Sequence, residues 1–170
     1  MHYLEHDSPL GRMLIAATDR GLRHVAFEDQ RHFKGIAGLQ PGSQHKPQHN
    51  PQHPLLQQAV QQLDAYFAGL LRNFELPLDT VGTEFQHSVW RGLLAIPFGR
   101  TSSYAELAHQ IGNPKAVRAV GAANGRNPIA IIVPCHRVIG AAGTLVGYAG
   151  GLERKRFLLA LESGQEEILL

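Results

Sequence analysis

The sequence of 170 residues contains one cysteine, Cys135, and this scarcity excludes several kinds of site. A single cysteine cannot form an intramolecular disulfide bond, nor can it supply the paired thiolates of two- or four-cysteine zinc sites. A free thiol is typical of proteins from a reducing compartment. We therefore expect neither a disulfide framework nor a cysteine-based zinc site.

Long apolar runs are also missing from the sequence. No stretch approaches the roughly 20 apolar residues that a helix needs to cross a bilayer. Residues 1–5 (MHYLE) lack the basic and then apolar order of a signal peptide. The sequence thus predicts a protein without a membrane anchor and, with its free thiol, a cytoplasmic location.

Negative charge is scarce in one long segment. Residues 1–80 hold 7 Lys/Arg and 8 Asp/Glu, a net charge of −1, whereas residues 81–170 hold 9 and 6, a net charge of +3. Between Leu107 and Leu152 there is no carboxylate, but there are four basic residues: Lys115, Arg118, Arg126 and Arg137. Such a segment is either a solvated basic face or a surface for a polyanion such as nucleic acid.

The N-terminal half has the pattern of a small sheet with one helix. Short apolar runs predict strands at 2–5, 13–18 and 22–27, the last two joined by a hairpin turn. A helix should follow, because Leu56, Val60, Leu63 and Phe67 fall on one helical face and Gly69 can end it. We place a domain boundary at residues 81–82, giving domains 1–80 and 81–170.

Residues 40–54 are polar and rich in proline, and they predict a flexible loop. His45, His49 and His53 recur at every fourth position, which on a helix would suggest a metal site. The prolines between them argue against a helix, so we expect no metal there.

The C-terminal half has strong helix signals. Thr83–Gln86 and Ser103–Glu106 both have the form of a capping box. The first should open a helix with Trp90 in the core. The second should open a helix that ends at Gly112, followed by another from Pro114, capped by Asn113, to about Asn124, with Val117, Val120 and Gly121 facing inward. Two short helices joined by a glycine-containing turn predict a helix-turn-helix, although such hairpins also occur in proteins that never bind DNA.

The second helix of this pair is unusually slim. Alanine and glycine dominate it, and Arg118 is the one long side chain in its middle. A helix that reads the major groove usually needs several long polar side chains. A slim helix suits the minor groove, where Arg118 could act as a wedge or occupy the place of a displaced base. The alternative is a small-residue face packed against a neighbouring helix.

Cys135 follows the apolar run 129–133 and precedes His136. Because the thiolate is the nucleophilic form, the sulfur needs a base or a positive field nearby. His136 is the candidate base, acting through a water, and Glu162 is the candidate acid to hold its imidazole. The alternative for His136 is a core histidine satisfied by the backbone. The glycine-rich segment 140–151 carries no charge, which fits either a neutral planar ligand such as a nucleobase or a mobile wing without a ligand.

Several of these motifs together resemble the O6-alkylguanine-DNA alkyltransferases. The likeness is carried by residues 134–139 (PCHRVI), by Asn127-Pro128 before them and by residues 147–151 (GYAGG) after them. Residues 83–99 are similar to the same family. The resemblance covers residues 81–162 closely and the N-terminal half only in general layout.

The resemblance implies an α+β fold: a small N-terminal antiparallel sheet with a helix, similar to RNase H, and a mainly helical, winged helix-turn-helix-like C-terminal domain for DNA binding and alkyl transfer. Cys135 would accept the alkyl group and then be spent. His136 and Glu162 would remove the thiol proton, Tyr104 would donate a proton to the departing guanine or help to rotate its phosphate, and Asn127 would brace the cysteine segment.

The same resemblance implies a DNA surface and a substrate pocket. Lys115, Tyr104, Arg118, Ala119 and Ala123 would contact the minor groove of duplex DNA that carries O6-alkylguanine. The carbonyls of Cys135 and Val138 would accept the guanine amino group, and Tyr148 and Ala149 would line the pocket.

The sequence departs from some relatives in having Ala149 where they have serine, so that a hydroxyl near O6 is absent. We expect no cofactor, no metal and a monomer, with cooperative binding on DNA left open. Two other functions remain: a non-catalytic module that recognises alkylated bases, against which the presence of Cys135 argues, and a winged-helix transcription regulator, against which the slim second helix argues.

Overall fold

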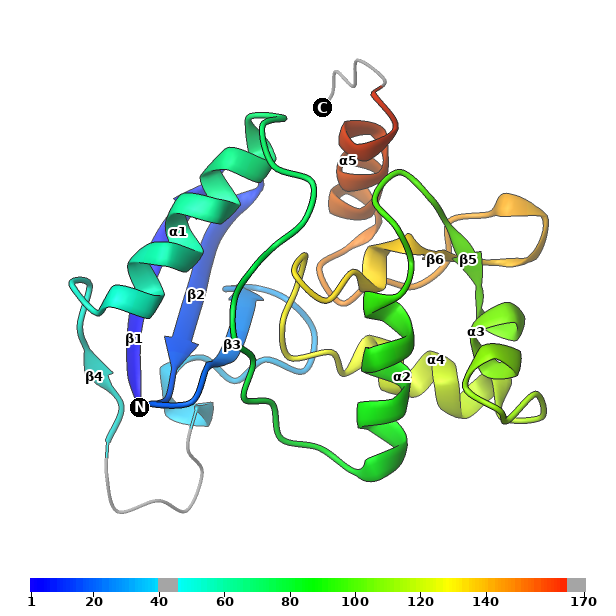
Figure 1. The fold of residues 1–170 in the computed structure, drawn as a ribbon, viewed down its shortest axis with the longest axis horizontal. Coiled ribbons are helices and arrows are strands. Elements are labelled where there is room, and N and C mark those ends of the chain that lie inside the picture. The colour runs from blue at the N-terminus through cyan, green and yellow to red at the C-terminus, as the bar shows by residue number, and fades with distance from the viewer. Residues whose placement is uncertain (40–45, 165–170) are drawn as a thin grey trace. The chain divides into compact units, whose positions relative to one another are not determined.

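The computed structural model describes residues 1–39 and 46–164, which form two compact units (Figure 1). The first comprises Met1–Val81 together with Pro128–Ala130, and the second comprises Gly82–Asn127 and the chain from Ile131 onward. The fold is α+β, with a small sheet in the first unit and mainly helices in the second. We expected a single boundary at residues 81–82. In the structure, Pro128–Ala130 also belong to the first unit, where the Val25 amide donates to the Pro128 carbonyl (2.9 Å).

The sheet of the first unit has four strands in the order β3-β2-β1-β4. Their bounds are β1 His2–Ser8, β2 Gly11–Ala17, β3 Leu22–Phe27 and β4 Gln48–His49. The first three strands are antiparallel, as expected, and the two-residue strand β4 adds a parallel pairing to β1 that was not expected. The pairing arises because the edge of β1 offers free carbonyls: Met1 accepts from Gln48 (2.9 Å) and Tyr3 from Asn50 (2.9 Å).

Strand β4 falls within the segment 40–54 for which a flexible loop was expected. Residues 40–45, including His45, lie outside the described residues, and no statement about them follows from the structure. The part that is described, from Lys46 on, holds β4 and leads directly into helix α1 (Pro54–Phe67). The prediction therefore missed backbone pairing that polar side chains do not signal.

The core of the first unit lies on both faces of β2, whose residues Met13 to Ala17 are all buried. Leu14 and Ala16 pack with Leu39 on one face. Because strand side chains alternate, Met13 and Ile15 point to the other face, which α1 covers over β1 and β2 (Figure 1). The buried residues of α1 are Leu56, Ala59, Leu63 and Tyr66. The buried face of α1 therefore differs slightly from the predicted one, since Val60 and Phe67 are only partly buried.

Up to Gly164, where the described residues end, the second unit holds four α-helices and two short strands. Their bounds are α2 Glu84–Leu94, α3 Tyr104–Gln110, α4 Val117–Gly125, α5 Leu152–Ser163, β5 Ser102–Ser103 and β6 Val138–Ile139, with β5 and β6 parallel. Three short 3-10 turns complete the described chain: η1 Ile36–Gly38 in the first unit, and η2 Cys135–Arg137 and η3 Ala141–Gly143 in the second.

Both expected capping boxes are confirmed. The Thr83 hydroxyl accepts from the Gln86 amide (3.1 Å) while the Gln86 side chain accepts from the Thr83 amide (3.0 Å). Ser103 and Glu106 make the same reciprocal pair at 3.0 and 3.3 Å. Each box satisfies two amides at the start of its helix, which fixes where α2 and α3 begin.

Helix α2 packs against α4 through Trp90. Its ring is buried, as expected, and its indole nitrogen donates to the Ala123 carbonyl (2.9 Å). Gly92 lets α2 approach α3 closely, because a Cβ there would lie 2.7 Å from Leu107 Cδ1. These contacts hold the helix-turn-helix against α2.

Helix α4 begins later than expected. Gly112 has a positive φ of 82° and ends the α3 segment, but Asn113 to Ala116 then form a turn in which the Asn113 carbonyl accepts from Ala116 (3.0 Å). The cap position of α4 is Ala116, not Asn113. Val117, expected to face inward, is 37% exposed because it starts the helix, whereas Val120 is fully buried.

Two negative findings concern only the part of the chain that the structure describes. No described helix combines the length and apolar character required to cross a bilayer. Within 1–39 and 46–164, no three His, Cys, Asp or Glu side chains are grouped so that they could hold a metal ion.

The first unit contains a histidine that should make stability depend on pH. Burial, with repulsion from Arg23, lowers the pKa of His24 from 6.5 to about 4. As the pH falls below 6.5 the unfolded chain binds a proton that folded His24 does not, so stability is lost towards pH 4. We expect His24 to account for about 2 kcal/mol of the loss between pH 7 and pH 4.5. Urea titrations of the wild type and of His24→Gln should show a smaller acid loss in the variant. Exposed His109→Gln is the control, and equal losses in all three proteins would contradict the assignment.

Candidate active site

Cys135 opens the turn η2 and is only 5% exposed. Its amide donates to the Val133 carbonyl (2.8 Å), and the Arg137 amide donates to Pro134 (3.0 Å). Burial raises the pKa of the Cys135 thiol to about 11, although a hydrogen bond with Asn127 and the charge of Lys155 oppose the shift. At neutral pH the sulfur therefore keeps its proton, and nucleophilic attack requires a group that removes it.

The approach to the cysteine is strained. Ile131 is buried and has a φ of 71°, a conformation that costs a β-branched residue on the order of 1–3 kcal/mol. The Asn127 side chain donates to the Val133 carbonyl (2.7 Å), and that of Asn124 donates to the Cys135 carbonyl (3.4 Å). The two asparagines, both buried, tie the end of α4 to the cysteine segment and so help to hold the strained turn.

His136 and Glu162 meet, as their positions in the sequence suggested. His136 is fully buried, and its Nε2 lies 2.7 Å from Glu162 Oε2. A carboxylate only accepts, so Nε2 donates and Nδ1 keeps its lone pair. Nδ1 is buried without a protein partner among the described residues. Burial lowers the pKa of His136 against the opposing effect of Glu162, so the imidazole is neutral and able to take a proton. The alternative of a histidine satisfied by the backbone was wrong.

Arg137 completes this buried group, which the sequence did not reveal. Its Nε donates to Glu162 Oε1 (2.7 Å), its Nη2 to Oε2 (3.1 Å) and its Nη1 to the Ile96 carbonyl (2.7 Å). Its guanidinium also lies 5.7 Å from the centre of the Phe98 ring. Arg137 therefore neutralises Glu162 and does not belong to the exposed basic segment in which we had placed it.

Cys135 influences the pKa values of two tyrosines, Tyr104 and Tyr148. The Tyr104 hydroxyl donates to the Val146 carbonyl (3.1 Å). The Tyr148 hydroxyl is buried and has no partner in the described structure. Burial, together with Cys135, raises the pKa of both phenols, so both keep their protons. Val138 is fully buried on β6, and Ala149 is half-buried beside Tyr148.

The residues that were expected to contact DNA differ in their exposure. Lys115, Arg118 and Ala119 are all exposed on or just before α4. Ala123, in contrast, is 3% exposed, and its carbonyl accepts from Trp90. Its inclusion among the DNA-contacting residues was wrong, because that side of α4 packs against α2.

Lys155 is a further buried residue that the sequence analysis did not identify. It is fully buried on α5, and its ammonium donates to three carbonyls: Val138 (2.6 Å), Val146 (2.9 Å) and Gly147 (3.0 Å). One signal was available: Lys155, Leu158 and Glu162 are spaced so that they share one helical face, and two of them are charged. A charged residue in line with a core leucine indicates a buried polar contact.

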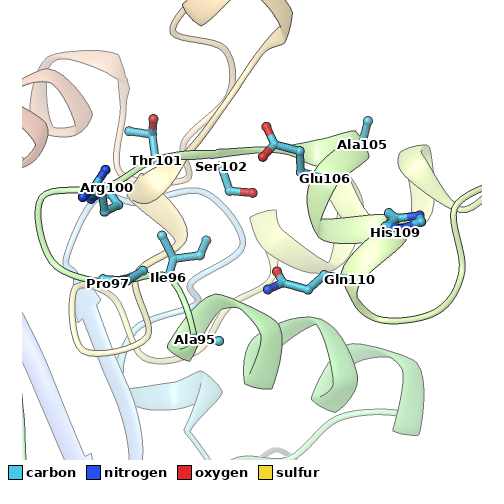
Figure 2. Close-up of a pocket in the computed structure, with 10 residues that line it drawn as sticks. All are labelled: Ala95, Ile96, Pro97, Arg100, Thr101, Ser102, Ala105, Glu106, His109 and Gln110. Atoms are coloured by element: carbon cyan, nitrogen blue, oxygen red, sulfur yellow. The ribbon is translucent and has the colours of Figure 1, made fainter.

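The Cys135 thiol does not line either of two cavities near α3. A cavity of about 590 Å³ lies between the end of α2 and the outer side of α3, with Arg100 at one end and His109 at the other (Figure 2). None of the expected site residues lines it. A neighbouring cavity of about 490 Å³ reaches Tyr104 and Val117 but not Cys135. The sulfur is therefore covered in the free protein.

The buried ion pair should matter strongly for stability. Arg137→Met would leave the Glu162 carboxylate with His136 but without its buried cation, which we expect to cost about 3–5 kcal/mol. Denaturant titration measures the loss, with exposed Arg156→Met as the matched control. A loss below about 1 kcal/mol would mean that the pair is not closed in solution.

The chain is similar over nearly its whole length to one group of known proteins. Residues 84–164 match the model of the 6-O-methylguanine DNA methyltransferase, DNA binding domain, and residues 1–80 match that of the 6-O-methylguanine DNA methyltransferase, ribonuclease-like domain. The methylated-DNA–protein-cysteine methyltransferase of Mycobacterium leprae is 50% identical over 165 residues, which are 97% of this chain and 94% of that protein. The protein of the same name from Methanosarcina acetivorans is 51% identical over 163 residues, 95% of this chain and 98% of that one.

A solved structure extends the likeness to the fold. The Mycobacterium tuberculosis OGT, crystallised in complex with DNA, superposes with a TM-score of 0.85 at 49% identity, covering 96% of this chain and 94% of that one. Both halves of the sequence and the fold point to the same relatives. The chain belongs to the 6-O-methylguanine DNA methyltransferase family.

Proposed function

We propose that this protein repairs DNA by transferring the alkyl group of O6-alkylguanine to Cys135, once per molecule. The proposal is carried by the buried Cys135 thiol and by His136, the next residue, whose neutral imidazole bonds Glu162 through Nε2 and leaves Nδ1 without a described partner. The names of its relatives, which cover nearly the whole chain, support the same reaction. The reaction needs no cofactor, because the acceptor is the protein's own sulfur.

The transfer divides into a proton step and a displacement. His136 Nδ1 removes the Cys135 proton through one bridging water, and the thiolate attacks the alkyl carbon in line with the bond to O6. The new S–C bond forms as the C–O6 bond breaks, and the electron pair of that bond stays with the guanine. Tyr104 donates a proton to the guanine and recovers it from solvent. The thioether product cannot be hydrolysed by these groups, so the protein is consumed.

The burial of the thiol explains why the proton must move within the site. With a pKa of about 11, forming the thiolate at pH 7 costs roughly 5 kcal/mol. A base held in place lowers this cost because it takes the proton within the site. The pairing of His136 with Glu162, and of Glu162 with Arg137, supports this role because it stabilises the imidazolium without leaving a free carboxylate.

The exposed face of α4 is suited to the minor groove of the DNA. Arg118 is its long side chain, and Ala119 and Ala122 beside it are small and exposed, which permits close approach of the backbone. Arg118 takes the place of the flipped nucleotide, and Lys115 contacts phosphate. One monomer acts on each lesion.

The flipped guanine binds between β6 and the loop before α5. The carbonyls of Cys135 and Val138 accept its amino group, and Tyr148 and Ala149 form the facing wall. The hydrogen bond from the Asn127 side chain to the Val133 carbonyl holds the cysteine segment in position beside this pocket. The alternatives, a recognition module or a transcription regulator, give no reason for a buried thiol with its own base.

The methyl acceptor can be identified directly. After incubation with duplex DNA containing O6-methylguanine, mass spectrometry should find one added methyl group on the peptide carrying Cys135, and lesions removed should equal protein molecules added. Cys135→Ala should abolish transfer and retain DNA binding. Removal of several lesions per molecule would refute the single-use mechanism.

The role of Arg118 can be separated from the chemistry. Arg118→Ala should slow repair of duplex DNA by at least about tenfold, because the displaced base is no longer replaced. Transfer from the free base O6-methylguanine should be unchanged. Exposed Arg100→Ala is the control for loss of positive charge. Equal losses on duplex and free base would contradict the base-flipping role.

A further inference from the structure

One atom of the buried Asn124 side chain, near the end of α4, has no role in the free protein. The residue is 4% exposed, and its carboxamide oxygen Oδ1 is buried without a hydrogen-bond donor in the described structure. A buried acceptor without a donor is costly, so it needs an explanation. In the described part of the second unit, the other buried side-chain atoms in this condition are His136 Nδ1 and the Tyr148 hydroxyl. Both already belong to the proposed site, which suggests that Asn124 Oδ1 also meets the substrate.

The orientation of the Asn124 carboxamide is fixed by its nitrogen. Nδ2 donates to the Cys135 carbonyl (3.4 Å), which can only accept. Burial, together with Cys135, raises the pKa of Tyr104, and a hydrogen bond with Asn124 opposes this shift. A bond that favours the phenolate is one that the phenol oxygen accepts, so Nδ2 is the donor there too, while the phenol donates its own proton to Val146 (3.1 Å). Both N–H bonds of the carboxamide are thereby used, and Oδ1 is left as an acceptor.

The Cys135 carbonyl is one of the two oxygens at which we place the guanine amino group. It accepts from the Val138 amide at the end of η2 and from Asn124, so an incoming amino group competes there with two existing donors. The oxygen and the nitrogen of a carboxamide share one carbon atom, so Oδ1 lies beside this carbonyl. It is the neighbouring acceptor that has no donor of its own.

A hydrogen bond to Oδ1 would discriminate between bases. An acceptor that is already buried lost its water when the protein folded, so the new bond costs only the desolvation of the base. A base without an N–H group at this place leaves Oδ1 unpaired, and sites built to pair a substrate group reject analogues that lack it. In DNA the 2-amino group holds the only N–H bonds of an O6-alkylguanine base, because N1 has no hydrogen once O6 is alkylated and N9 bears the sugar. The 2-amino group is therefore the donor that fits Oδ1.

We propose that Asn124 is a specificity-determining residue: its carboxamide oxygen accepts the 2-amino group of the flipped base and selects alkylated purines that carry this group. The inference rests on the proposed function, to which it adds a side chain that recognises the base. A merely structural Asn124 would brace the cysteine segment, as Asn127 does through the Val133 carbonyl, and would not distinguish one base from another.

The amino group can be removed from the substrate without changing the protein. Single-stranded oligonucleotides containing O6-methylguanine or O6-methylhypoxanthine carry the same methyl group on the same oxygen, but the second base lacks the 2-amino group. The single-turnover rate of methyl transfer to the wild type, read by intact mass, should be at least about tenfold lower for O6-methylhypoxanthine. Equal rates on the two substrates would overturn this inference and leave the proposed function standing. Transfer from neither substrate would overturn the proposed function itself.

Variants assign the discrimination to one side chain. Asn124→Leu keeps the volume but has no acceptor, so the ratio of the two rates should fall about tenfold. Asn127→Leu is the matched control: it removes the other buried carboxamide of this segment, so both rates should fall by the same factor and their ratio should stay within about twofold of the wild type. The ratio compares two substrates on one preparation, so a partial loss of folded protein cancels.

A third variant separates the oxygen of Asn124 from its nitrogen. Asn124→Asp retains a side-chain oxygen that accepts, so it should keep most of the wild-type ratio even where both rates are lower. A wild-type ratio in Asn124→Leu would overturn the proposal. So would a ratio that falls as far in Asn124→Asp as in Asn124→Leu, or one that falls equally in Asn127→Leu.

Discussion

The carboxylate of Glu162 is the constraint on which the site depends. It accepts from His136 at 2.7 Å and from Arg137 at 2.7 and 3.1 Å, all inside the second unit. A single carboxylate thereby decides which imidazole nitrogen carries the proton and which is free to act as a base. Arg137 makes this possible, because an uncompensated carboxylate at the same depth would raise the pKa of His136 and favour its charged form. The imidazole would then already hold the proton that it must remove from Cys135.

Burial is the second constraint, and it acts on the thiol in two opposite ways. It raises the pKa of Cys135 to about 11, which protects the single sulfur from reaction with solvent oxidants and alkylating agents. It also strengthens local electrostatic interactions, so that the pairing of His136 with Glu162 acts at full effect once a substrate excludes water. A protein that can react only once benefits from a nucleophile that is unreactive until the correct group arrives.

The sequence allowed the prediction of contacts that depend on neighbours within one helix or on a distinctive type of residue. The two capping boxes and the core position of Trp90 followed from spacing within a helix. The pairing of His136 with Glu162 followed from the choice of the one acid on the last helix that does not stand among basic residues. The spacing of Lys155 with Leu158 and Glu162 indicates one buried face of α5, but periodicity does not identify the backbone carbonyls that Lys155 binds. Nor does it show that α2 covers the side of α4 that holds Ala123. Strand β4 was missed for the same reason, since only its backbone pairs.

Helix α4 connects the surface that carries Arg118 with the segment that carries Cys135. Its exposed side carries Arg118, while its C-terminal end is tied to the cysteine segment by Asn124 and Asn127. Seven residues of helix, about 10 Å, separate Arg118 from the end of α4. Under the proposed function, a rigid element of this length fixes the distance between Arg118 and the thiol, so that a base displaced by Arg118 reaches one place. The buried asparagines would then link the proposed DNA surface to Cys135, and the strain at Ile131 is held because both ends of that segment are bonded.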